Sequence, residues 1–358
     1  MVSKSEEELR AYCECLLRAS GMTPGNAEMA ADVYVRATLR GVGHHDISEL
    51  ASRARKVRNH EMVANPSFQK LTGFHAMESY DGGNGMGELC CAMGMRRAME
   101  LADQYGIGLA AMRNTNHFLA GAPYTEMAAE RGYIGLILAK GGVSMGITGA
   151  NKCMSALPMS FAYPVREEYP VLLDACMAYA SFGQLAQRAE RGQKVKPWWG
   201  CDAQGKPTED PAEMARGIRY PIGEYKGFGL AMLGEVLTAV LSGAGVLDQV
   251  QNFGGDHALD QTQSHGSDRI PNRTQTHEAH TVIAIKADAL VSKEEFLDRA
   301  QFLSDRARQL SGCDLHIPGD GSRKAVGRSR ETNCIFLSEQ VVNDLKKLEK
   351  EWNLEMRL

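Results

Sequence analysis

The part of the chain that most constrains its fold lies between residues 74 and 140, where short apolar runs alternate with helical patterns. The predicted elements are, in chain order, a short strand, a glycine-rich turn (Asp81–Gly87), a helix (Glu88–Tyr105), a strand (Ile107–Met112), a polar loop (Arg113–His117), a helix (Pro123–Arg131) and a strand (Ile134–Ala139). Strands that alternate with helices are typical of an α/β domain. We therefore expect an α/β fold.

Helical patterns lie on both sides of this segment. Ser5 is a candidate cap for the first helix, Thr23 and Pro24 are typical of a second helix start, and a basic helix is predicted over Glu49–Met62. Further strands are predicted within 155–164, 170–176 and 280–287, and further helices over 226–245, 292–312 and 337–353. The capping-box pair of the helix at 292 is Ser292 and Glu295. The polar stretch 248–279 has no clear period and is expected to be a long surface loop.

Composition excludes several classes of protein. The chain has 358 residues, of which 44% are hydrophobic and 23% charged, as in soluble globular proteins of about two or three domains. A formal net charge of −4 gives no reason to expect nucleic acid or an anionic membrane as a partner. The apolar runs are too short or too interrupted for a transmembrane helix, and the N-terminus lacks the apolar core of a signal peptide.

The nine cysteines include no CxxC pair, and their number is odd. This pattern fits reduced thiols in the cytoplasm better than a disulfide framework. No metal site is expected, because the pair His277 and His280 is too isolated to suggest one.

The polar loop "RNTNHFLAG" is the clearest candidate for chemistry. Asn, Thr, Asn and His between a buried strand and a helix are costly unless they form hydrogen bonds. His117 is a natural general acid/base, although a loop satisfied by its own side-chain bonds is almost as plausible. The glycine-rich turn "DGGNGMG" lacks both Walker and Rossmann spacing, and tight-turn geometry explains it better than phosphate binding.

Several motifs, in this order, are distinctive together. They include "LRGVGHHDISEL", "DGGNGMG", "RNTNHFLAGAPYTEMAAERGYIGLILA", "LLDACMAYASFGQLAQRAERGQKVKPWWGCDAQGKPTEDP", "YKGFGLAMLGEVLTAVLSG" and "HIPGD". Over nearly its whole length the chain resembles the malate/L-lactate dehydrogenase type-2 family of NAD(P)-dependent oxidoreductases. That family includes ureidoglycolate and sulfolactate dehydrogenases, 2,3-diketogulonate reductase and cyclic-imine carboxylate reductases.

The resemblance implies a fold peculiar to the family instead of a Rossmann domain. A cofactor domain with a mainly antiparallel sheet would lie beside a helical layer that both chain ends form. The corresponding boundaries are a helical, substrate-side layer at 1–72, a cofactor-binding α/β domain at 73–310 and a C-terminal segment at 311–358 that returns to the helical layer. The resemblance also implies a homodimer with its active site between domains.

The same resemblance assigns site residues. His117 would be the general acid/base beside the nicotinamide of NAD or NADP, and His45 would lie close to a small-molecule substrate. The positions on cofactor-contacting stretches are Asn116, Lys140, Gly141, Ser155, Asp174, Ala175, Cys176, Lys226, Pro318, Gly319 and Asp320.

On the substrate side, the chain departs from the family pattern "D-S-H-G-V-x-R-x-x-x-Y". His44 replaces the serine, Asp46 the glycine, Glu49 the arginine that binds the substrate carboxylate, and Arg53 the tyrosine. Glu49 and Arg53 are four residues apart on a predicted helix, so they can pair with each other. A bidentate arginine–carboxylate contact is hard to replace.

The resemblance places His44, Asp46, Glu49 and Arg53 on the substrate side, and three interpretations of the change remain open. Arg53 could bind the anion from one turn further along. Alternatively, the substrate could lack a carboxylate at that end, or carry an amine that Glu49 accepts, and this interpretation is favoured. In the third, the helix faces solvent with a surface salt bridge that contributes less than ~1 kcal/mol.

The cofactor side departs from the pattern as well. "SALP" stands where the family has "G-T-N-P", and Met177, Ala178, Phe182 and Gln184 replace polar or basic residues. Each lost hydrogen bond to a bound group costs roughly 0.5–1.5 kcal/mol. Either backbone groups and Lys140 hold the nicotinamide, or cofactor use has changed.

The leading hypothesis is an NAD(P)-dependent dehydrogenase or reductase of a small hydroxy/keto, or amine/imine, compound with an altered substrate pocket. The alternative keeps the scaffold but uses its histidines for cofactor-independent acid/base chemistry, as a lyase, hydrolase or isomerase. A non-catalytic homologue is disfavoured because His45, His117 and Lys226 are all present.

Overall fold

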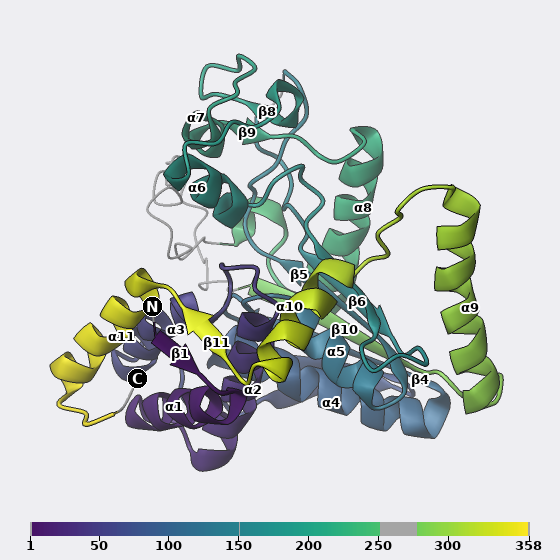
Figure 1. Cartoon of the computed structure of the whole chain (residues 1–358), viewed down its shortest axis with the longest axis horizontal. Helices are drawn as coiled ribbons and strands as arrows, with labels where there is room; N and C mark the ends of the chain where they lie inside the picture. The colour runs from purple at the N-terminus through teal and green to yellow at the C-terminus, as the bar shows by residue number, and fades with distance from the viewer. Residues whose placement is uncertain (1, 150, 251–277, 357–358) are drawn as a thin grey trace.

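The computed structural model describes residues 2–149, 151–250 and 278–356. Its centre is a seven-stranded sheet (Figure 1). In spatial order the strands are β2 (Gln69–Phe74), β3 (Met77–Gly85), β4 (Ile107–Thr115), β10 (Glu278–Lys286), β5 (Tyr133–Lys140), β6 (Met159–Tyr163) and β7 (Val171–Ala175). Only β3 and β4 pair in parallel. The expected α/β fold with a mainly antiparallel, non-Rossmann sheet is confirmed.

Helices cover both faces of this sheet. They are α4 (Gly87–Tyr105), α5 (Ala122–Glu130) and α8 (Tyr225–Glu235), which continues as a π-helical turn (Val236–Val240). Thr281 of β10 donates a hydrogen bond to the Leu237 carbonyl oxygen at 2.7 Å, whereas its neighbour Val282 lies against Gly94 of α4. Successive strand residues point to opposite faces, so α4 and the π-helical turn lie on opposite sides. Burial on both faces explains the apolar runs of β5 and of residues 282–285 in β10.

Gly87 allows a close approach that the polar loop requires. A Cβ atom at Gly87 would lie 2.2 Å from the Asn116 carbonyl oxygen and 2.3 Å from that of His117. The first turn of α4 can therefore pack directly on the backbone that carries His117. The end of the glycine-rich turn thus serves chain packing, as the tight-turn interpretation expected.

The two ends of the chain come together beside the sheet (Figure 1). Strand β1 (Val2–Lys4) pairs with β11 (Ile335–Leu337), and the Tyr12 hydroxyl donates to Glu349 at 2.6 Å. The helices of this layer are α1 (Glu6–Ala19), α2 (Pro24–Leu39), α3 (Leu50–Arg58) and α11 (Glu339–Trp352). Ser5 caps α1 in a capping box with Glu8. The expected helical layer from both chain ends is confirmed.

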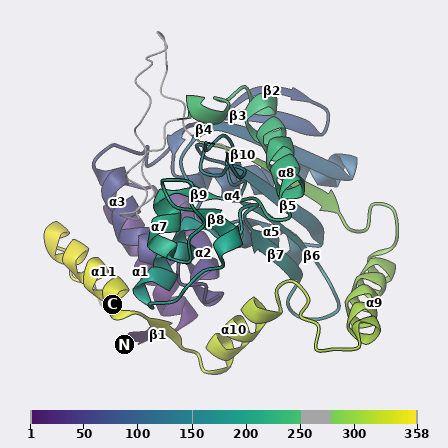
Figure 2. The same cartoon turned by 90° about the horizontal axis from the view of Figure 1, so that it is seen from above.

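A small lobe lies apart from the sheet (Figure 1). It contains α6 (Phe182–Glu190), α7 (Pro211–Arg216) and the short strands β8 (Gly200–Cys201) and β9 (Ile218–Arg219), around a core that includes Leu185 and Met214. Helix α9 (Lys293–Ser311) lies at the periphery of the molecule, as Figure 2 shows from above. Among the described residues, no helix combines the length and apolarity needed to span a bilayer.

Several predicted element bounds were wrong. The basic helix expected over Glu49–Met62 is shorter, because a 3-10 turn (Ile47–Glu49) precedes α3 and the helix ends at Arg58. Asp81–Gly85 belongs to β3, because this part of the turn pairs with its neighbours. Helix α10 (Asp320–Glu331) was not predicted, because its sequence is mainly polar and carries two internal glycines. Most of the loop expected at 248–279 lies outside the described residues.

Candidate active site

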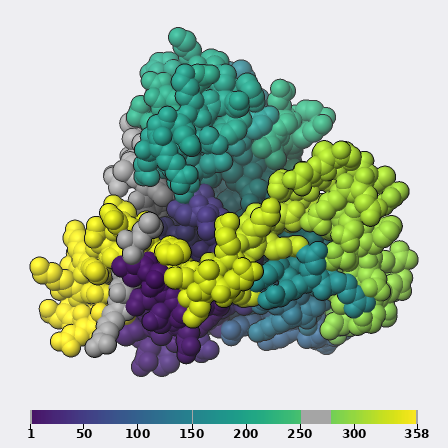
Figure 3. Space-filling model, viewed as in Figure 1, coloured from purple at the N-terminus to yellow at the C-terminus, as the bar shows by residue number. Residues whose placement is uncertain are grey.

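A cleft of about 720 Å³ lies where the small lobe faces the end of β7, the end of α2 and the start of α10. Figure 3 shows the hollow between the lobe and the segments below it. His44, His45 and His117 all line this cleft. The structure therefore brings together three of the predicted site residues from two segments about seventy residues apart in the chain.

The stretch that carries His44 and His45 is an ordered turn. His45 has a φ of 54°, a left-handed conformation that is uncommon for residues other than glycine. Asp46 follows and caps the 3-10 turn, since its carboxylate accepts a hydrogen bond from the Ser48 amide at 2.9 Å. Burial raises the pKa of Asp46. Asp46 thus has a structural contact in the turn, and the cleft is lined by the two histidines before it.

Glu49 lies beneath His45 and joins it to Arg53. Its Oε1 is 2.6 Å from His45 Nδ1, and its Oε2 is 2.7 Å from Nη2 of Arg53. Glu49 is 5% exposed and Arg53 4% exposed. The expected i, i+4 pair is confirmed, but the interpretation in which the helix faces solvent was wrong, because both side chains are buried.

Arg53 continues the network to His117. Its Nη1 donates to the His117 carbonyl oxygen at 2.8 Å, and its Nη2 lies 2.9 Å from His117 Nδ1. Its Nε is also 3.4 Å from Glu88 of α4, whose other contact is the Tyr34 hydroxyl at 2.7 Å. One buried guanidinium therefore connects two carboxylates with the ring and backbone of His117.

The pKa values of His45 and His117 are shifted in opposite directions. Burial would raise the pKa of Glu49, but the charges of Arg53 and His45 hold it well below its usual range. Burial disfavours the imidazolium of His45, yet the Glu49 carboxylate outweighs this and raises the pKa of His45. Burial and the positive charge of Arg53 lower the pKa of His117 well below its usual range. The ring centroids of these two histidines are only 5.0 Å apart.

His45, Glu49 and His117 also offer potential metal ligands, whose atoms lie within 4.8 Å of one another. However, the Arg53 guanidinium already contacts Glu49 and the Nδ1 atom of His117. A metal cation would have to compete with this fixed positive charge. The geometry therefore favours an ion-pair network over a metal centre.

The predicted cofactor-side residues fall into two groups. Asp174, Ala175, Cys176 and Gly319 line the cleft. The Asp174 carboxylate accepts a hydrogen bond from the Ala122 amide at the start of α5, at 2.7 Å. This group therefore places the end of β7 and the start of α10 beside the histidines.

The remaining cofactor-side residues do not line the cleft. Four of them make hydrogen bonds or ion pairs elsewhere: Asn116 donates to Asn84 and Gly85, Ser155 accepts from the Leu157 amide, Pro318 accepts from the Leu172 amide, and Asp320 pairs with Arg308. Gly141 lies near Glu278. Lys226 is exposed in the first turn of α8. Lys140 is buried, and its ammonium donates to the carbonyl oxygens of Gly245 and Leu247 and pairs with Glu235. Lys140 thus fixes the chain after α8.

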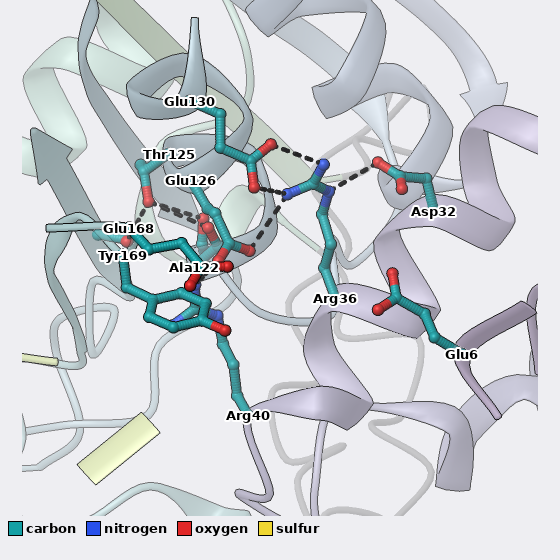
Figure 4. A network of polar contacts seen from close by, with 12 residues as sticks. Glu6, Asp32, Arg36, Arg40, Ala122, Thr125, Glu126, Glu130, Glu168 and Tyr169 are labelled. Atoms are coloured by element: carbon teal, nitrogen blue, oxygen red, sulfur yellow. Dashed lines mark hydrogen bonds and ion pairs between the residues drawn. The ribbon is translucent and has the colours of Figure 1, made fainter. Parts of the chain in front are cut away.

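Sequence reasoning missed several residues of the cleft, chiefly Arg40 and Gln187. Arg40 is 8% exposed, and its Nη2 pairs with Glu126 at 2.5 Å, while its Nε has no hydrogen-bond partner among the described residues. Figure 4 shows Arg40 beside Glu126, in the network through which Arg36 joins α2 to α5. In the sequence, the position of Arg40 shortly before His44 and His45 was the feature that could have indicated its place in the cleft.

Comparison with known proteins agrees with this architecture. The family model described as malate/L-lactate dehydrogenase matches residues 4–346. The 2,3-diketo-L-gulonate reductase of Salmonella typhi is 27% identical over 342 residues, which cover 94% of this chain and 96% of that protein. The sulfolactate dehydrogenase structure from Methanocaldococcus jannaschii has a TM-score of 0.84 at 25% identity, covering 99% and 98% of the two chains. The malate dehydrogenase structure from Entamoeba histolytica has a TM-score of 0.85 at 22% identity, covering 100% and 99%.

The matched family and the fold are thus those of an enzyme of the dehydrogenase/reductase kind. The chain belongs to the malate/L-lactate dehydrogenase family.

Proposed function

We propose that this protein is an NAD(P)-dependent oxidoreductase that transfers hydride between nicotinamide and a small hydroxy/keto compound, or its amine/imine equivalent. The observation that carries the proposal is the pair His45 and His117, whose ring centroids lie 5.0 Å apart and whose side chains line the same cleft. The chain that holds this pair belongs to a family of dehydrogenases. Opposite pKa shifts in two neighbouring groups are typical of sites that transfer protons.

The cleft fits a nicotinamide dinucleotide together with a small substrate. Its volume of about 720 Å³ lies within the usual range for cofactor sites, and much of its lining consists of alanine and glycine. Gly321 and Ser322 lie in the first turn of α10 and line the cleft, as does Arg40, whose Nε has no hydrogen-bond partner in the described part of the chain. A helix N-terminus and a guanidinium are both suited to phosphate groups. These residues would hold the dinucleotide, which supplies or accepts the hydride.

The residues of this chain have separate tasks in the proposed reaction. The backbone of Asp174–Cys176 forms the cleft wall, while His45 and His117 contact the oxygen, or nitrogen, of the reacting group. The small lobe covers the cleft on the side of Gln184 and Gln187 and limits access of water. A positioned acid/base of this kind typically contributes a factor of roughly 10² to 10⁴ to the rate.

The cleft lacks the arginine that the family pattern places at the position of Glu49, so we infer a preference for compounds without a carboxylate at that end. Both oxygens of Glu49 are engaged by His45 and Arg53, and neither Glu49 nor Arg53 lines the cleft. Direct contact of Glu49 with a substrate amine therefore finds no support in this geometry, and neither does capture of an anion by Arg53. The relatives reduce or oxidise compounds named as a diketogulonate and a sulfolactate.

The test is a spectroscopic screen for oxidation of NADH and NADPH with a panel of 2-keto acids, keto amides and cyclic imines. We expect turnover with one of the two cofactors, and faster turnover of neutral keto compounds than of the matched keto acids. No turnover with either cofactor, together with no heat of nucleotide binding in calorimetry, would contradict the proposal.

We also propose a homodimer. Helix α8 and its π-helical continuation expose an apolar face that a monomer would leave in water, with Tyr225, Leu230, Leu233, Val236 and Val240 between 46% and 76% exposed. Contiguous exposed apolar patches of this kind mark interaction surfaces.

A further inference from the structure

We propose that His280 is a positioning residue for His117: its Nε2–H holds the Asn116 carbonyl oxygen and so fixes the loop that brings His117 into the cleft. His280 lies on β10, is fully buried and does not line the cleft, so it acts through His117 and not on the substrate. This inference rests on the proposed function, in which His117 contacts the reacting group.

A β-bulge lies directly beside His280. Between the pairs Glu278–Thr115 and His280–Met112, β4 carries one residue more than β10. Bulges of this kind bend a strand, change the direction of its side chains and are common next to active sites. The strand that leads into the His117 loop is therefore irregular at the level of His280, and regular pairing does not fix the course of the loop.

His280 lies on the side of the sheet that α4 covers. It shares a face of β10 with Val282, which lies against Gly94 of α4. The His280 ring also lies beside Phe118 of the loop, with ring centroids 5.2 Å apart. The side chain therefore packs beneath the loop that carries His117.

The His280 ring donates a hydrogen bond to this loop. Its Nε2 lies 3.0 Å from the Asn116 carbonyl oxygen, which can only accept. Burial lowers the pKa of His280 to about 4, so the ring is neutral at neutral pH and carries its single proton on Nε2. Its Nδ1 has no hydrogen-bond partner among the described residues. His280 is thus a fixed donor directed at one peptide group.

His280 completes a set of three donors around His117. Residues 116–120 lie outside helices and strands, so their buried carbonyl groups need partners from elsewhere. Each of three consecutive carbonyl groups accepts a hydrogen bond from a buried side chain: Asn116 from His280, His117 from Arg53 and Phe118 from Tyr124. The donors come from β10, α3 and α5. Three different elements therefore hold three consecutive peptide groups.

The contact of His280 has a direct consequence for the ring of His117. The Asn116 carbonyl belongs to the peptide group that joins Asn116 to His117, and rotation of this group changes φ of His117 and moves its side chain. Without the donor of His280, the peptide group gains freedom to turn. Because a displacement of about 1 Å at a reacting group can lower a rate by roughly a hundredfold, His280 should affect the chemical step more than binding.

Three substitutions at His280 test the inference in the full chain, with NADH or NADPH oxidation by a keto compound as the assay. Glutamine places an amide nitrogen near the position of Nε2, asparagine places one near Nδ1, and leucine has no donor. We expect His280→Leu and His280→Asn to lower kcat by roughly tenfold to a hundredfold, with the wild-type dissociation constant for the nucleotide in calorimetry. His280→Gln should restore most of kcat. A wild-type kcat in His280→Leu, or equal kcat in the glutamine and asparagine variants, would overturn the inference.

Thr281→Val is the matched control. Thr281 is also fully buried on β10, and its hydroxyl donates to the Leu237 carbonyl oxygen at 2.7 Å on the other face of the sheet. This variant loses a buried bond between a side chain and a carbonyl group, as His280→Leu does, but Thr281 contacts neither the loop nor the cleft. We expect both variants to lose thermal stability, and only His280→Leu to lose kcat. An equal fall of kcat in both variants would show that His280 has a general structural role and would contradict the inference.

Histidine NMR tests the same contact without substrate or nucleotide. In two-bond ¹H–¹⁵N correlation spectra of the full chain, we expect His280 to carry one proton, on Nε2, and to stay neutral until the pH falls toward 4. His280→Gln and His117→Gln assign the two signals. The side-chain signals of His117 should shift in His280→Leu and return toward their wild-type positions in His280→Gln. A proton on Nδ1 of neutral His280, or His117 signals that are unchanged in His280→Leu, would overturn the inference.

The outcomes separate this inference from the proposed function. If the wild type turns over no keto compound with either nucleotide, the proposed function fails, while the NMR comparison still decides whether His280 positions His117. If the wild type is active and His280→Leu keeps its kcat, only this inference fails. Should His280→Leu not fold, the tautomer of His280 in the wild type and the kcat of His280→Gln against His280→Asn decide.

Discussion

The Arg53 guanidinium lies between Glu49 and His117, with Nη2 at 2.7 Å from Oε2 of Glu49 and 2.9 Å from Nδ1 of His117. In the family pattern, an arginine occupies the position of Glu49 and a tyrosine that of Arg53. In this chain the guanidinium is therefore one helical turn further along, at Arg53, where it is buried and does not line the cleft. Neither Glu49 nor Arg53 lines the cleft, whereas Arg53 contacts His117, which does.

Removal of Arg53 should destabilise the protein strongly. Arg53→Met leaves Glu49 and Glu88 buried without their counter-ion, and breaking a buried pair in this way costs about 3–5 kcal/mol. Arg97→Met is the control, because Arg97 is about one-third exposed and its partner Glu78 keeps a second cation, Lys70, so this variant should lose less stability. Urea unfolding measures both free energies, and equal losses in the two variants would contradict the account.

The buried pair also predicts how stability depends on pH. Arg53 and His45 hold the pKa of Glu49 well below its usual value of 4.5. The contribution of Glu49 to stability is therefore complete above that value and disappears as pH falls through the lower, folded-state pKa. The stability gap between the wild type and Glu49→Gln should therefore narrow on acidification below about pH 4.5. Urea midpoints measured at a series of pH values test this, and a gap independent of pH would contradict it.

The start of α10 should recognise the phosphate groups of the dinucleotide. Ser322→Glu places a carboxylate at this helix N-terminus within the cleft, and its repulsion of phosphate should weaken NADH or NADPH binding by about tenfold or more. Ser329→Glu lies near the other end of the same helix, outside the cleft lining, and should bind as the wild type does. Isothermal calorimetry gives both dissociation constants, and an unchanged value for Ser322→Glu would exclude this assignment.

The exposed face of α8 should mediate association. Leu233 is 52% exposed within the apolar face, and Leu233→Asp should shift the protein from dimer to monomer in sedimentation velocity. Leu290 is 97% exposed in the turn before α9, so Leu290→Asp should leave the assembly intact. A monomeric wild type, or a dimeric Leu233→Asp variant, would contradict the proposal.

Much of the fold was predictable because its elements carry local signals. The apolar strand Tyr133–Lys140 and the capped helix that begins after Ser5 are specified by nearby residues. Helix α10 was missed because a polar helix with glycines has little local signal, and it forms where Gly319 adopts a φ of 97° against β7. Its stability depends on tertiary packing, which a pattern within one segment does not contain.

Part of the cleft lining was predictable from the sequence, but the geometry of the candidate site was not. His45, His117 and the spacing of Glu49 and Arg53 are visible in the sequence, and the i, i+4 pair was expected. The contact of Arg53 with His117 spans 64 positions of the chain, so no local spacing predicts it. This one long-range contact places a guanidinium beside Nδ1 of His117.

The central claim is that the cleft holds a redox site in which His45 and His117 contact the reacting group of the substrate. The most direct measurement compares NADH or NADPH oxidation by the wild type and by His45→Gln with the same keto compound, alongside nucleotide binding by calorimetry. We predict that the variant binds nucleotide as the wild type does but reduces substrate slower by a factor of roughly 10² to 10⁴. A wild type that neither binds nor oxidises the nucleotide, or a His45→Gln variant with the wild-type rate, would contradict the claim.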